Sequence, residues 1–520
     1  MALKGKARTI IRLFVVLAAI VWYWNKHRVP EAHHAGPDAA AVAVTPVPAK
    51  PMPMRHWRLG DLDLASCELP HRNSGATTAA WCTDFDVAED PEQPGGRHIG
   101  LRVAVIRSDA AAPDPDIVVM ITGGPGEAST EDFADTGVYK GVLKHRNVLL
   151  VDQRGTGHSN PLDCDNARKE AGAPSDPDSV RKSVGACLLE VQKIADPRFY
   201  TTTIAVEDLE KLRQALGAPL LDLYGVSYGT RVAQHYAIRH PDGVRAIVLD
   251  SPAPNQVVLG QDFAASLDLA LKRDFADCIA APACDKAFGD PMVTLHKLRE
   301  SLRSNPRDVT MRDPRNFEIV SHTLTPARLT GLVRLFAYAP ETAALLPLSI
   351  DAAARGDFTP LVGQERLLEG DLAGAMNGGM SMSVVCSEES DLLRERPEDA
   401  DTILGNQLIA TLRAQCDIWP HGSMPADFHA PLKTGKPVLI LSGERDPVTP
   451  PDYGKQILDA LPKARQLVLK GQGHGALNRG CTPKLFERFI DDPDPGKLDA
   501  DCLDRLGPIP ALIDFNGAAP

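Results

Sequence analysis

Residues 225–229 read Gly-Val-Ser-Tyr-Gly, a G-x-S-x-G pentapeptide that stands between a short apolar run and a segment with helical spacing. The run Leu220–Tyr224 predicts a strand, and Thr230–Arg239 predicts a helix. The pentapeptide alone is a weak signal, since chance matches are common, but a strand–turn–helix context is what a nucleophilic serine requires. Glycines near the serine permit a tight turn that projects its hydroxyl above the N-terminus of the helix. We therefore predict that Ser227 is a nucleophile rather than part of an ordinary Gly/Ser turn.

Short apolar runs alternate with helical segments on both sides of this turn. Continuous runs such as Ile117–Ile121 predict strands that are buried on both faces of a sheet, other segments are strand-like, and the helical spacing of Val206–Leu216 adds a helix between two predicted strands. The predicted strands are Leu101–Arg107, which alternates, Ile117–Ile121, Asn147–Asp152, Ala246–Leu249, Pro437–Ser442 and Arg465–Leu469. Strands that alternate with helices predict the α/β class, with a mostly parallel central sheet and helices on both faces.

The segment 255–431 differs from its flanks, because it lacks such strands and carries helical runs. These runs are Phe263–Ile279, Thr325–Ala337 and Thr402–Cys416. We interpret 255–431 as a helical cap that is inserted between two halves of one α/β core. The first half is 56–254, and the second half, with a C-terminal tail, is 432–520.

A serine hydroxyl is a poor nucleophile at neutral pH and needs a base. In folds with this strand–turn–helix element the chain order is serine, acid, histidine, so the base should follow Ser227. His474 comes directly after the predicted strand Arg465–Leu469, in a loop whose flanking glycines let the imidazole be presented. His421 and His429 lack a preceding strand, which makes His474 the predicted base.

The acid should orient the imidazole and stabilise its cation. Asp446 follows the predicted strand Pro437–Ser442, and its turn lies between the last two strands, close to where His474 emerges. Asp250 is a rival because it also ends a strand, although it could instead cap a helix or a turn. Glu444 is a weaker rival, and we favour Asp446.

Two backbone N–H groups should face the charge that develops on the attacked carbonyl oxygen. One is predicted to be that of Tyr228, directly after the nucleophile. The other should come from Gly123 or Gly124, in the glycine-rich loop after the strand Ile117–Ile121, where glycines permit a close approach of the backbone. A plain tight turn is the alternative for this loop. A phosphate-binding loop is disfavoured because no Lys-Ser/Thr follows.

Composition excludes several classes of protein. The 520 residues are 43% hydrophobic and 24% charged, which is a globular composition rather than a disordered, collagen-like or multispan membrane one. The net charge of −12 and the absence of a basic cluster in the body argue against a nucleic-acid partner. No HExxH motif, CxxC pair or carboxylate–histidine cluster occurs in the sequence, so no metal cofactor is implied.

The N-terminus has the pattern of an export signal. Basic residues up to Arg12 precede the apolar run Leu13–Trp24, and no small-x-small cleavage site follows directly. We expect residues 1–28 to be a signal peptide or an uncleaved signal anchor, and 29–55 to be an Ala/Pro-rich linker. The chain has 10 cysteines, and this even number indicates disulfides if the chain is exported, whereas free thiols would be expected in a cytosolic enzyme.

Five segments match one protein family as a set. They are Gly-Gly-Pro-Gly at 123–126, Asp-Gln-Arg-Gly-Thr-Gly at 152–157, Gly-Val-Ser-Tyr-Gly-Thr at 225–230, Asp-Pro-Val-Thr-Pro at 446–450 and Gly-His-Gly at 473–475. In this order they resemble the prolyl aminopeptidase family of serine exopeptidases, within the α/β-hydrolase fold, and more narrowly its exported tripeptidyl aminopeptidase-like branch. Thr122 departs from the family pattern, which often has a histidine before the glycines.

The resemblance implies an α/β-hydrolase fold and the hydrolysis of peptides from a free N-terminus. The family recognises the α-amine with acidic residues in its helical cap, and Glu388 and Glu389 match that segment. An exposed acidic helix start before Leu392 is the other interpretation. The cysteines fit the same picture through sequential pairing, although sequence does not prove the connectivity. The pairs would be Cys67–Cys82, Cys164–Cys187, Cys278–Cys284, Cys386–Cys416 and Cys481–Cys502.

We therefore expect an exported serine exopeptidase, periplasmic or extracellular, that cleaves short peptides through Ser227, His474 and Asp446 and an acyl-enzyme. A carboxylesterase or another acyl hydrolase of the same fold is the alternative, because the core chemistry is shared. A non-catalytic, membrane-tethered binding protein is disfavoured by the complete set of three residues. Small peptides are the expected partners, an uncleaved N-terminal segment would tether the protein to a membrane, and the oligomeric state is not predicted.

Overall fold

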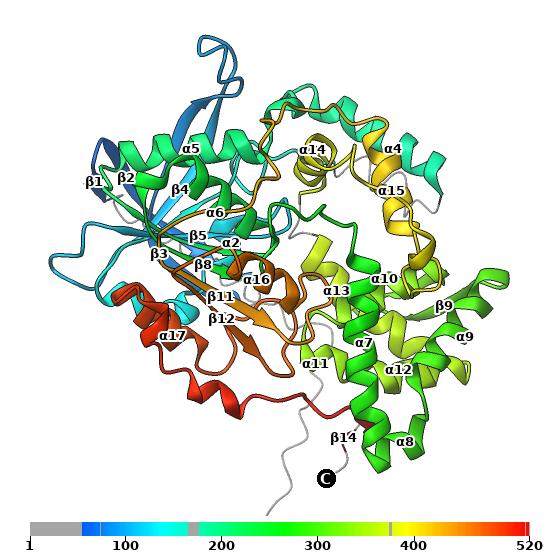
Figure 1. Cartoon of the computed structure of the whole chain (residues 1–520). Helices are drawn as coiled ribbons and strands as arrows, with labels where there is room; N and C mark the ends of the chain where they lie inside the picture. The colour runs from blue at the N-terminus through cyan, green and yellow to red at the C-terminus, as the bar shows by residue number, and fades with distance from the viewer. Residues whose placement is uncertain (1–54, 73, 165–175, 374–376, 515, 519–520) are drawn as a thin grey trace, which may run out of the picture. The chain divides into compact units, whose positions relative to one another are not determined.

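A ten-stranded sheet organises the part of the chain that the computed structural model describes. That part covers residues 55–72, 74–164, 176–373, 377–514 and 516–518, so the predicted signal segment 1–28 and almost all of the predicted linker 29–55 lie outside it. The strand order is β1-β2-β3-β4-β6-β5-β7-β8-β11-β12 (Figure 1). The strands are β1 His56–Leu59, β2 Leu62–Pro70, β3 Thr77–Ala88, β4 His98–Ile106, β5 Ile117–Ile121, β6 Val148–Val151, β7 Leu221–Val226, β8 Val244–Asp250, β11 Val438–Gly443 and β12 Ala464–Leu469.

The two halves of this sheet differ in strand direction. From β6 to β12 all neighbouring strands are parallel, as the alternation of strands and helices predicted, and the α/β class with flanking helices is confirmed. From β1 to β4 the strands form an antiparallel meander that joins β6, and of this half only β4 was predicted. The reason is burial: β5 is buried throughout, whereas β2 and β3 mix buried and exposed positions and show no continuous apolar run.

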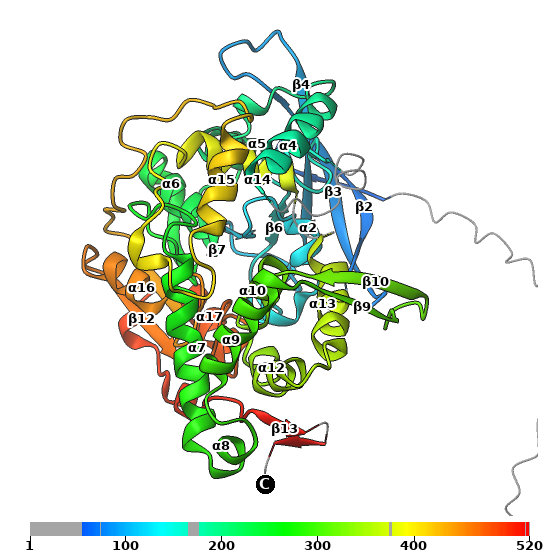
Figure 2. The ribbon, with the colours of Figure 1, turned by 90° about the vertical axis from the view of Figure 1, so that its right-hand side faces the viewer.

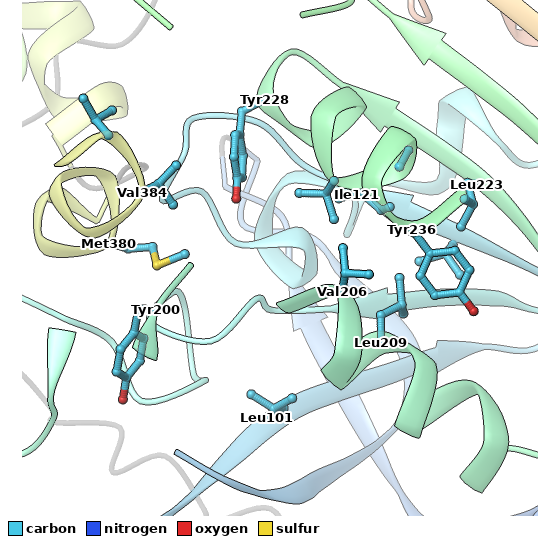
Figure 3. Close-up of a cluster of buried hydrophobic side chains, with 14 of the residues drawn as sticks. Leu101, Ile121, Tyr200, Val206, Leu209, Leu223, Tyr228, Tyr236, Met380 and Val384 are labelled. Atoms are coloured by element: carbon cyan, nitrogen blue, oxygen red, sulfur yellow. The ribbon is translucent and has the colours of Figure 1, made fainter. Parts of the chain in front are cut away.

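Helices cover both faces of the parallel strands. They include α2 (Ser129–Asp132), α5 (Thr202–Ala215), α6 (Tyr228–Arg239), α16 (Pro451–Leu458) and α17 (Thr482–Asp491), while α4 (Pro177–Val191) packs against α15 (Gln407–Cys416). On one face, Val119 and Ile121 of β5 join an apolar cluster with α5 and α6 (Figure 3). On the other face, Val118 and Met120 join a cluster with α17. Because successive residues of a strand point to opposite faces, a strand covered on both sides is apolar at every position.

A set of helices lies between β8 and β11 in the chain (Figure 2). These helices have an apolar cluster of their own. The helices are α7 (Phe263–Ala280), α8 (Pro282–Phe288), α9 (Pro291–Ser304), α10 (Pro326–Phe336), α11 (Pro340–Ala343), α12 (Leu346–Ala354), α13 (Thr359–Ala373), α14 (Gly378–Glu388) and α15 (Gln407–Cys416). α7, α9, α10 and α12 form this cluster, with Phe275 and Leu332 among its members. α14 differs, because its Met380 and Val384 pack into the cluster of the α/β core (Figure 3).

The inserted segment, predicted as helical, also contains a pair of strands that was not predicted. β9 (Arg307–Arg312) and β10 (Ile319–Leu324) form an antiparallel hairpin within it. Most of its residues are at least partly exposed, so the hairpin lacks the continuous apolar run by which the core strands were predicted. A second small antiparallel pair, β13 (Leu512–Asp514) and β14 (Gly517–Ala518), lies near the C-terminus.

Disulfide bonds pair all ten cysteines in sequential order. The pairs are Cys67–Cys82, Cys164–Cys187, Cys278–Cys284, Cys386–Cys416 and Cys481–Cys502. Such a set is typical of proteins that fold in an oxidising compartment. Within the described ranges, every helix is too short or too polar to span a bilayer.

Candidate active site

Ser227 lies in the sharp turn between β7 and α6, at the carboxyl end of the parallel strands. Its φ is 54° and its ψ is −124°, a conformation that a residue with a side chain adopts only where the surrounding structure enforces it. The flanking glycines are sterically required. A Cβ on Gly225 would lie 2.4 Å from the Gly229 carbonyl oxygen, and a Cβ on Gly229 would lie 2.4 Å from the Ile121 carbonyl oxygen. The G-x-S-x-G pattern therefore expresses a backbone requirement of this turn.

His474 and Asp446, the predicted base and acid, are in contact. His474 Nδ1 lies 2.8 Å from Asp446 Oδ2. The Asp446 carboxylate also accepts the backbone N–H groups of Val448 and Thr449, each at 2.8 Å, and the Thr449 hydroxyl at 2.9 Å. These donors fix the carboxylate so that one of its oxygens faces the ring.

The charges of this pair favour an ionised acid and a base that can accept a proton. Burial raises the pKa of Asp446, but the opposing charge of His474 and the hydrogen bonds to the carboxylate outweigh it and hold this pKa below its usual value. Burial lowers the pKa of His474, but the charge and hydrogen bond of Asp446 outweigh it and raise this pKa. An ionised Asp446 keeps a proton on Nδ1 of the neutral ring, so Nε2 carries the lone pair.

The two rival acids contact the backbone of the histidine loop instead of the ring. The Asp250 carboxylate accepts the N–H groups of the second and third residues after His474, each at 2.8 Å. The Asp250 carbonyl oxygen accepts the Ser227 N–H at 2.9 Å, so this residue joins the serine turn to the histidine loop. Glu444 accepts a backbone N–H of the same loop at 2.8 Å. Of the three acids considered, Asp446 is the one that contacts the imidazole.

A residue of the inserted helices holds His474 in place. The carbonyl oxygen of Tyr338, just after α10, accepts the His474 N–H at 2.7 Å. The Tyr338 ring packs edge-on against the imidazole, with 5.2 Å between the ring centroids. A Cβ on Gly473 would lie 2.2 Å from the Tyr338 carbonyl oxygen, which explains the glycine before the histidine. The insertion therefore contributes to the candidate site.

The glycine-rich loop after β5 lies against Ser227. A Cβ on Gly123 would be 3.0 Å from the Ser227 Cβ, and Gly124 has a φ of 101°, which favours glycine. Asn377, the N-cap of α14, donates its N–H to the carbonyl oxygen of the last glycine of this loop at 2.8 Å. Tyr228 is the first residue of α6, so its N–H has no partner within the helix. The two segments predicted to supply oxyanion donors thus meet at the serine.

One contact of this loop was not predicted. The Gly123 N–H donates to the Glu127 carboxylate at 3.1 Å, so one of the predicted oxyanion donors has a partner inside the protein. Burial raises the pKa of Glu127 to about 7, and the nearby Asp132 acts in the same direction. The signal for Glu127 in the sequence is an acid directly after the glycine-rich motif, but the sequence reasoning used the glycines alone.

Glu388 and Glu389, predicted to bind a substrate amine, are buried at the end of α14 and have partners inside the protein. The Glu388 carboxylate accepts the Thr202 N–H at 2.7 Å and the Thr202 hydroxyl at 3.0 Å. Burial raises the pKa of Glu388 to about 8. Glu389 forms an ion pair with Arg231, and both side chains of this pair are fully buried. These contacts weaken the predicted role, and the other interpretation, an exposed acidic helix start, is wrong because both residues are buried.

Among the described residues, no three His, Cys, Asp or Glu side chains are grouped so as to hold a metal ion. The candidate site presents a serine hydroxyl in a strained turn, an imidazole that contacts a carboxylate, and backbone N–H groups beside the serine.

Comparisons with known proteins agree with this architecture. A family model for the alpha/beta hydrolase fold matches residues 116–477. The chain is 27% identical over 462 residues to a protein named serine protease Hip1 from Mycobacterium tuberculosis, which covers 79% of this chain and 85% of that protein. It is 25% identical over 459 residues to a tripeptidyl aminopeptidase from Streptomyces lividans, covering 81% and 82%. It is also 25% identical over 501 residues to a protein named carboxylesterase B from Mycobacterium tuberculosis, covering 88% and 91%.

Proposed function

The chain belongs to the alpha/beta hydrolase family, and we propose that this serine hydrolase is an exopeptidase that cleaves short peptides from a free N-terminus. Relatives named serine protease Hip1 and tripeptidyl aminopeptidase support a peptidase. The observation that carries the proposal is the contact of His474 with Asp446, in a loop that Asp250 joins to the strained turn of Ser227. A nucleophile, a base and an acid related in this way perform acyl transfer.

In the proposed mechanism, Ser227 attacks the carbonyl carbon of the scissile peptide bond while His474 Nε2 accepts the proton of the hydroxyl. Asp446 holds the ring through Nδ1 and stabilises the imidazolium. The N–H groups of Tyr228 and of the loop 123–124 stabilise the oxyanion. His474 then donates its proton to the leaving amine. Water, with its proton accepted by His474, hydrolyses the acyl-enzyme and restores the serine.

The proposal includes export and a cap. Five disulfides favour an oxidising compartment, and the predicted signal segment 1–28 would direct the chain to the periplasm or the medium, either cleaved or retained as a tether. The segment 255–431 would act as a cap over the serine. Two contacts support this role, that of Tyr338 with His474 and that of Asn377 with the loop after β5.

A fluorophosphonate probe tests the assignment of the nucleophile. We expect the wild-type protein to be labelled in a one-to-one ratio at Ser227, as mass spectrometry of its peptides would locate, and Ser227→Ala to remain unlabelled. A folded wild-type protein that takes no label would refute the hydrolase mechanism and favour a non-catalytic binding protein.

A carboxylesterase is the second candidate, because one relative of similar coverage carries that name. The two functions differ in what they require beside the scissile bond. An exopeptidase of this kind prefers an aminoacyl p-nitroanilide with a free amine over its N-acetyl form, whereas an esterase hydrolyses p-nitrophenyl esters and has no need of the amine. Preference for the blocked substrate or activity on esters alone would favour the esterase.

A further inference from the structure

Glu127 is a carboxylate beside the candidate nucleophile that the proposed mechanism does not use. The point where a Cβ on Gly123 would lie is 3.0 Å from the Ser227 Cβ and 3.1 Å from Glu127 Oε2. The carboxylate is therefore within reach of a ligand that is bound at the serine. The Glu127 residue is only partly buried, so it is not sealed inside the fold.

Within the described ranges, Glu127 has hydrogen-bond donors but forms no ion pair. Two groups that can carry a positive charge act on it from a distance, and both have acidic partners of their own. Arg72 pairs with Glu131 at 3.0 Å and with Asp132 at 2.5 Å, and His474 contacts Asp446 at 2.8 Å. A carboxylate that is largely removed from water requires a cation or a proton. The candidate site thus presents an acid whose cation would have to come from a ligand.

We propose that Glu127 binds the α-ammonium group of the residue whose carbonyl Ser227 attacks, which makes the protein an aminopeptidase that releases one residue at a time. This inference rests on the proposed function, since it takes a peptide as the substrate. Glu127 accepts the same Gly123 N–H that was predicted to face the carbonyl oxygen. Within one amino-acid residue the α-nitrogen and the carbonyl oxygen lie about 3 Å apart, whereas two more residues would move the amine about 7 Å further away.

Binding of the ammonium would also release the oxyanion donor. Glu127 holds the Gly123 N–H, and this N–H can turn to a substrate oxygen only if the carboxylate gains other donors. An ammonium supplies them as charge-assisted hydrogen bonds. A blocked N-terminus supplies none, so Gly123 stays with Glu127 and the oxyanion lacks one donor. Selection for a free N-terminus therefore acts on kcat as well as on KM.

Titration of Glu127 provides a second signature. The groups that face it are Asp132, Arg72, His474 and Tyr338. Burial and then Asp132 raise the pKa of Glu127 to about 7, so the carboxyl loses its charge as the pH falls below that value. The ratio of kcat/KM for the free and the blocked substrate is expected to fall with it. Protonation of His474 lowers both rates and cancels in this ratio.

The test measures kcat/KM for alanine p-nitroanilide, its N-acetyl form and trialanine p-nitroanilide. For Glu127→Gln we expect a loss of about 100-fold on alanine p-nitroanilide, a change of less than about threefold on the N-acetyl form, and no acid limb in their ratio. Glu127→Ala should in addition raise kcat on the N-acetyl form, because it releases the Gly123 N–H. Glu131→Gln is the matched control, since Glu131 pairs with Arg72 in a more exposed position, and it should leave the ratio unchanged.

Four outcomes would contradict the proposal. If kcat/KM fell equally for the free and the blocked substrate in both Glu127 variants, Glu127 would only stabilise its own loop. A wild-type preference for trialanine over alanine p-nitroanilide would place the amine elsewhere. A free-amine preference that survives in Glu127→Gln would remove Glu127 but leave the exopeptidase standing, with Glu388 and Glu389 as the acids to examine. A wild-type preference for the blocked substrate, with intact labelling of Ser227, would refute the exopeptidase function itself.

Discussion

Two acids at the carboxyl edge of the sheet, Asp446 and Glu127, and two at the end of α14, Glu388 and Glu389, are all wholly or partly buried, but they contact different kinds of partner. At the sheet edge, Asp446 contacts an imidazole and Glu127 accepts a backbone N–H beside the candidate nucleophile. At the end of α14, Glu388 accepts donors from the first residue of α5, and Glu389 pairs with an arginine of α6. One pair faces the proposed chemistry, and the other holds three helices together.

Burial does not separate the two regions. Burial is the first cause of the raised pKa of both Glu127 and Glu388, which reach about 7 and about 8. The difference lies in the donors. Glu389 is paired with an arginine, whereas neither Glu388 nor Glu127 forms an ion pair with a described residue. Glu388 accepts two donors from Thr202, and Glu127 accepts the Thr122 hydroxyl and the N–H of Gly123, which lies beside the candidate nucleophile. A carboxyl with a shifted pKa is therefore a candidate for ligand binding when it accepts a hydrogen bond from a group that the substrate could also use, as Glu127 does from the Gly123 N–H.

Asp446→Asn is expected to have the largest effect and tests the sheet edge. The amide would favour the wrong tautomer of His474, so kcat should fall about 10⁴-fold on any substrate while the fold is retained. Asp250→Asn is the matched control, because Asp250 contacts backbone N–H groups of the same loop. It should lower the free energy of unfolding and affect kcat far less. If both variants lost activity equally, the distinction between the two aspartates would fail.

Glu389→Ala tests the opposite region through stability. It would leave the fully buried Arg231 without its counter-charge, so the free energy of unfolding should fall by about 3–5 kcal/mol in urea denaturation. Asp427→Ala removes the exposed partner of Arg239, and it should leave that free energy almost unchanged because water screens exposed ion pairs. A small loss of stability in Glu389→Ala, together with loss of the free-amine preference, would reverse the comparison and assign Glu389 to the substrate.

The smallest expected effect is on the pH dependence of the free energy of unfolding, and it concerns Glu388. The pKa of Glu388 rises from 4.5 to about 8 on folding, so between these values the folded protein keeps a proton that the unfolded chain releases. This group's contribution to stability is complete below about pH 4.5, declines as the pH rises, and levels off above about pH 8. Glu388→Gln should remove this slope from the denaturation data. Parallel curves for the two proteins would mean that Glu388 is ionised in the fold and free to meet a cation.

Sequence patterns predicted the features of the site that depend on short segments. Ser227 and Asp446 follow strands whose residues are almost all buried, whereas His474 follows β12, which is only partly buried. β11 and β12 are neighbours in the sheet. The order of strands and loops alone was enough to expect the last two side chains to meet. The same reasoning could not find β1–β3 or the hairpin β9–β10, because their partly exposed residues form no continuous apolar run.

Other contacts depend on packing that no local pattern records. The partners of Glu388 and Glu389 lie 186 and 158 residues away in the chain, and they meet these acids because α14 packs on the α/β core. The contact of Glu127 spans four residues, but it requires the loop to fold back on itself. The sequence shows that Glu127 follows the glycines, but which group donates to its carboxylate depends on the path of the backbone.

The backbone shape of the serine turn predicts which of its residues would be replaced first during evolution. Gly225 and Gly229 are kept by clashes with the backbone that exist whether or not the protein hydrolyses anything. Ser227 is kept by the reaction alone, because glycine would be less strained at a φ of 54°. In a related protein that no longer hydrolysed a substrate, we therefore expect Ser227 to be replaced before Gly225 and Gly229. The two glycines would then indicate common descent, whereas the serine would indicate retained activity.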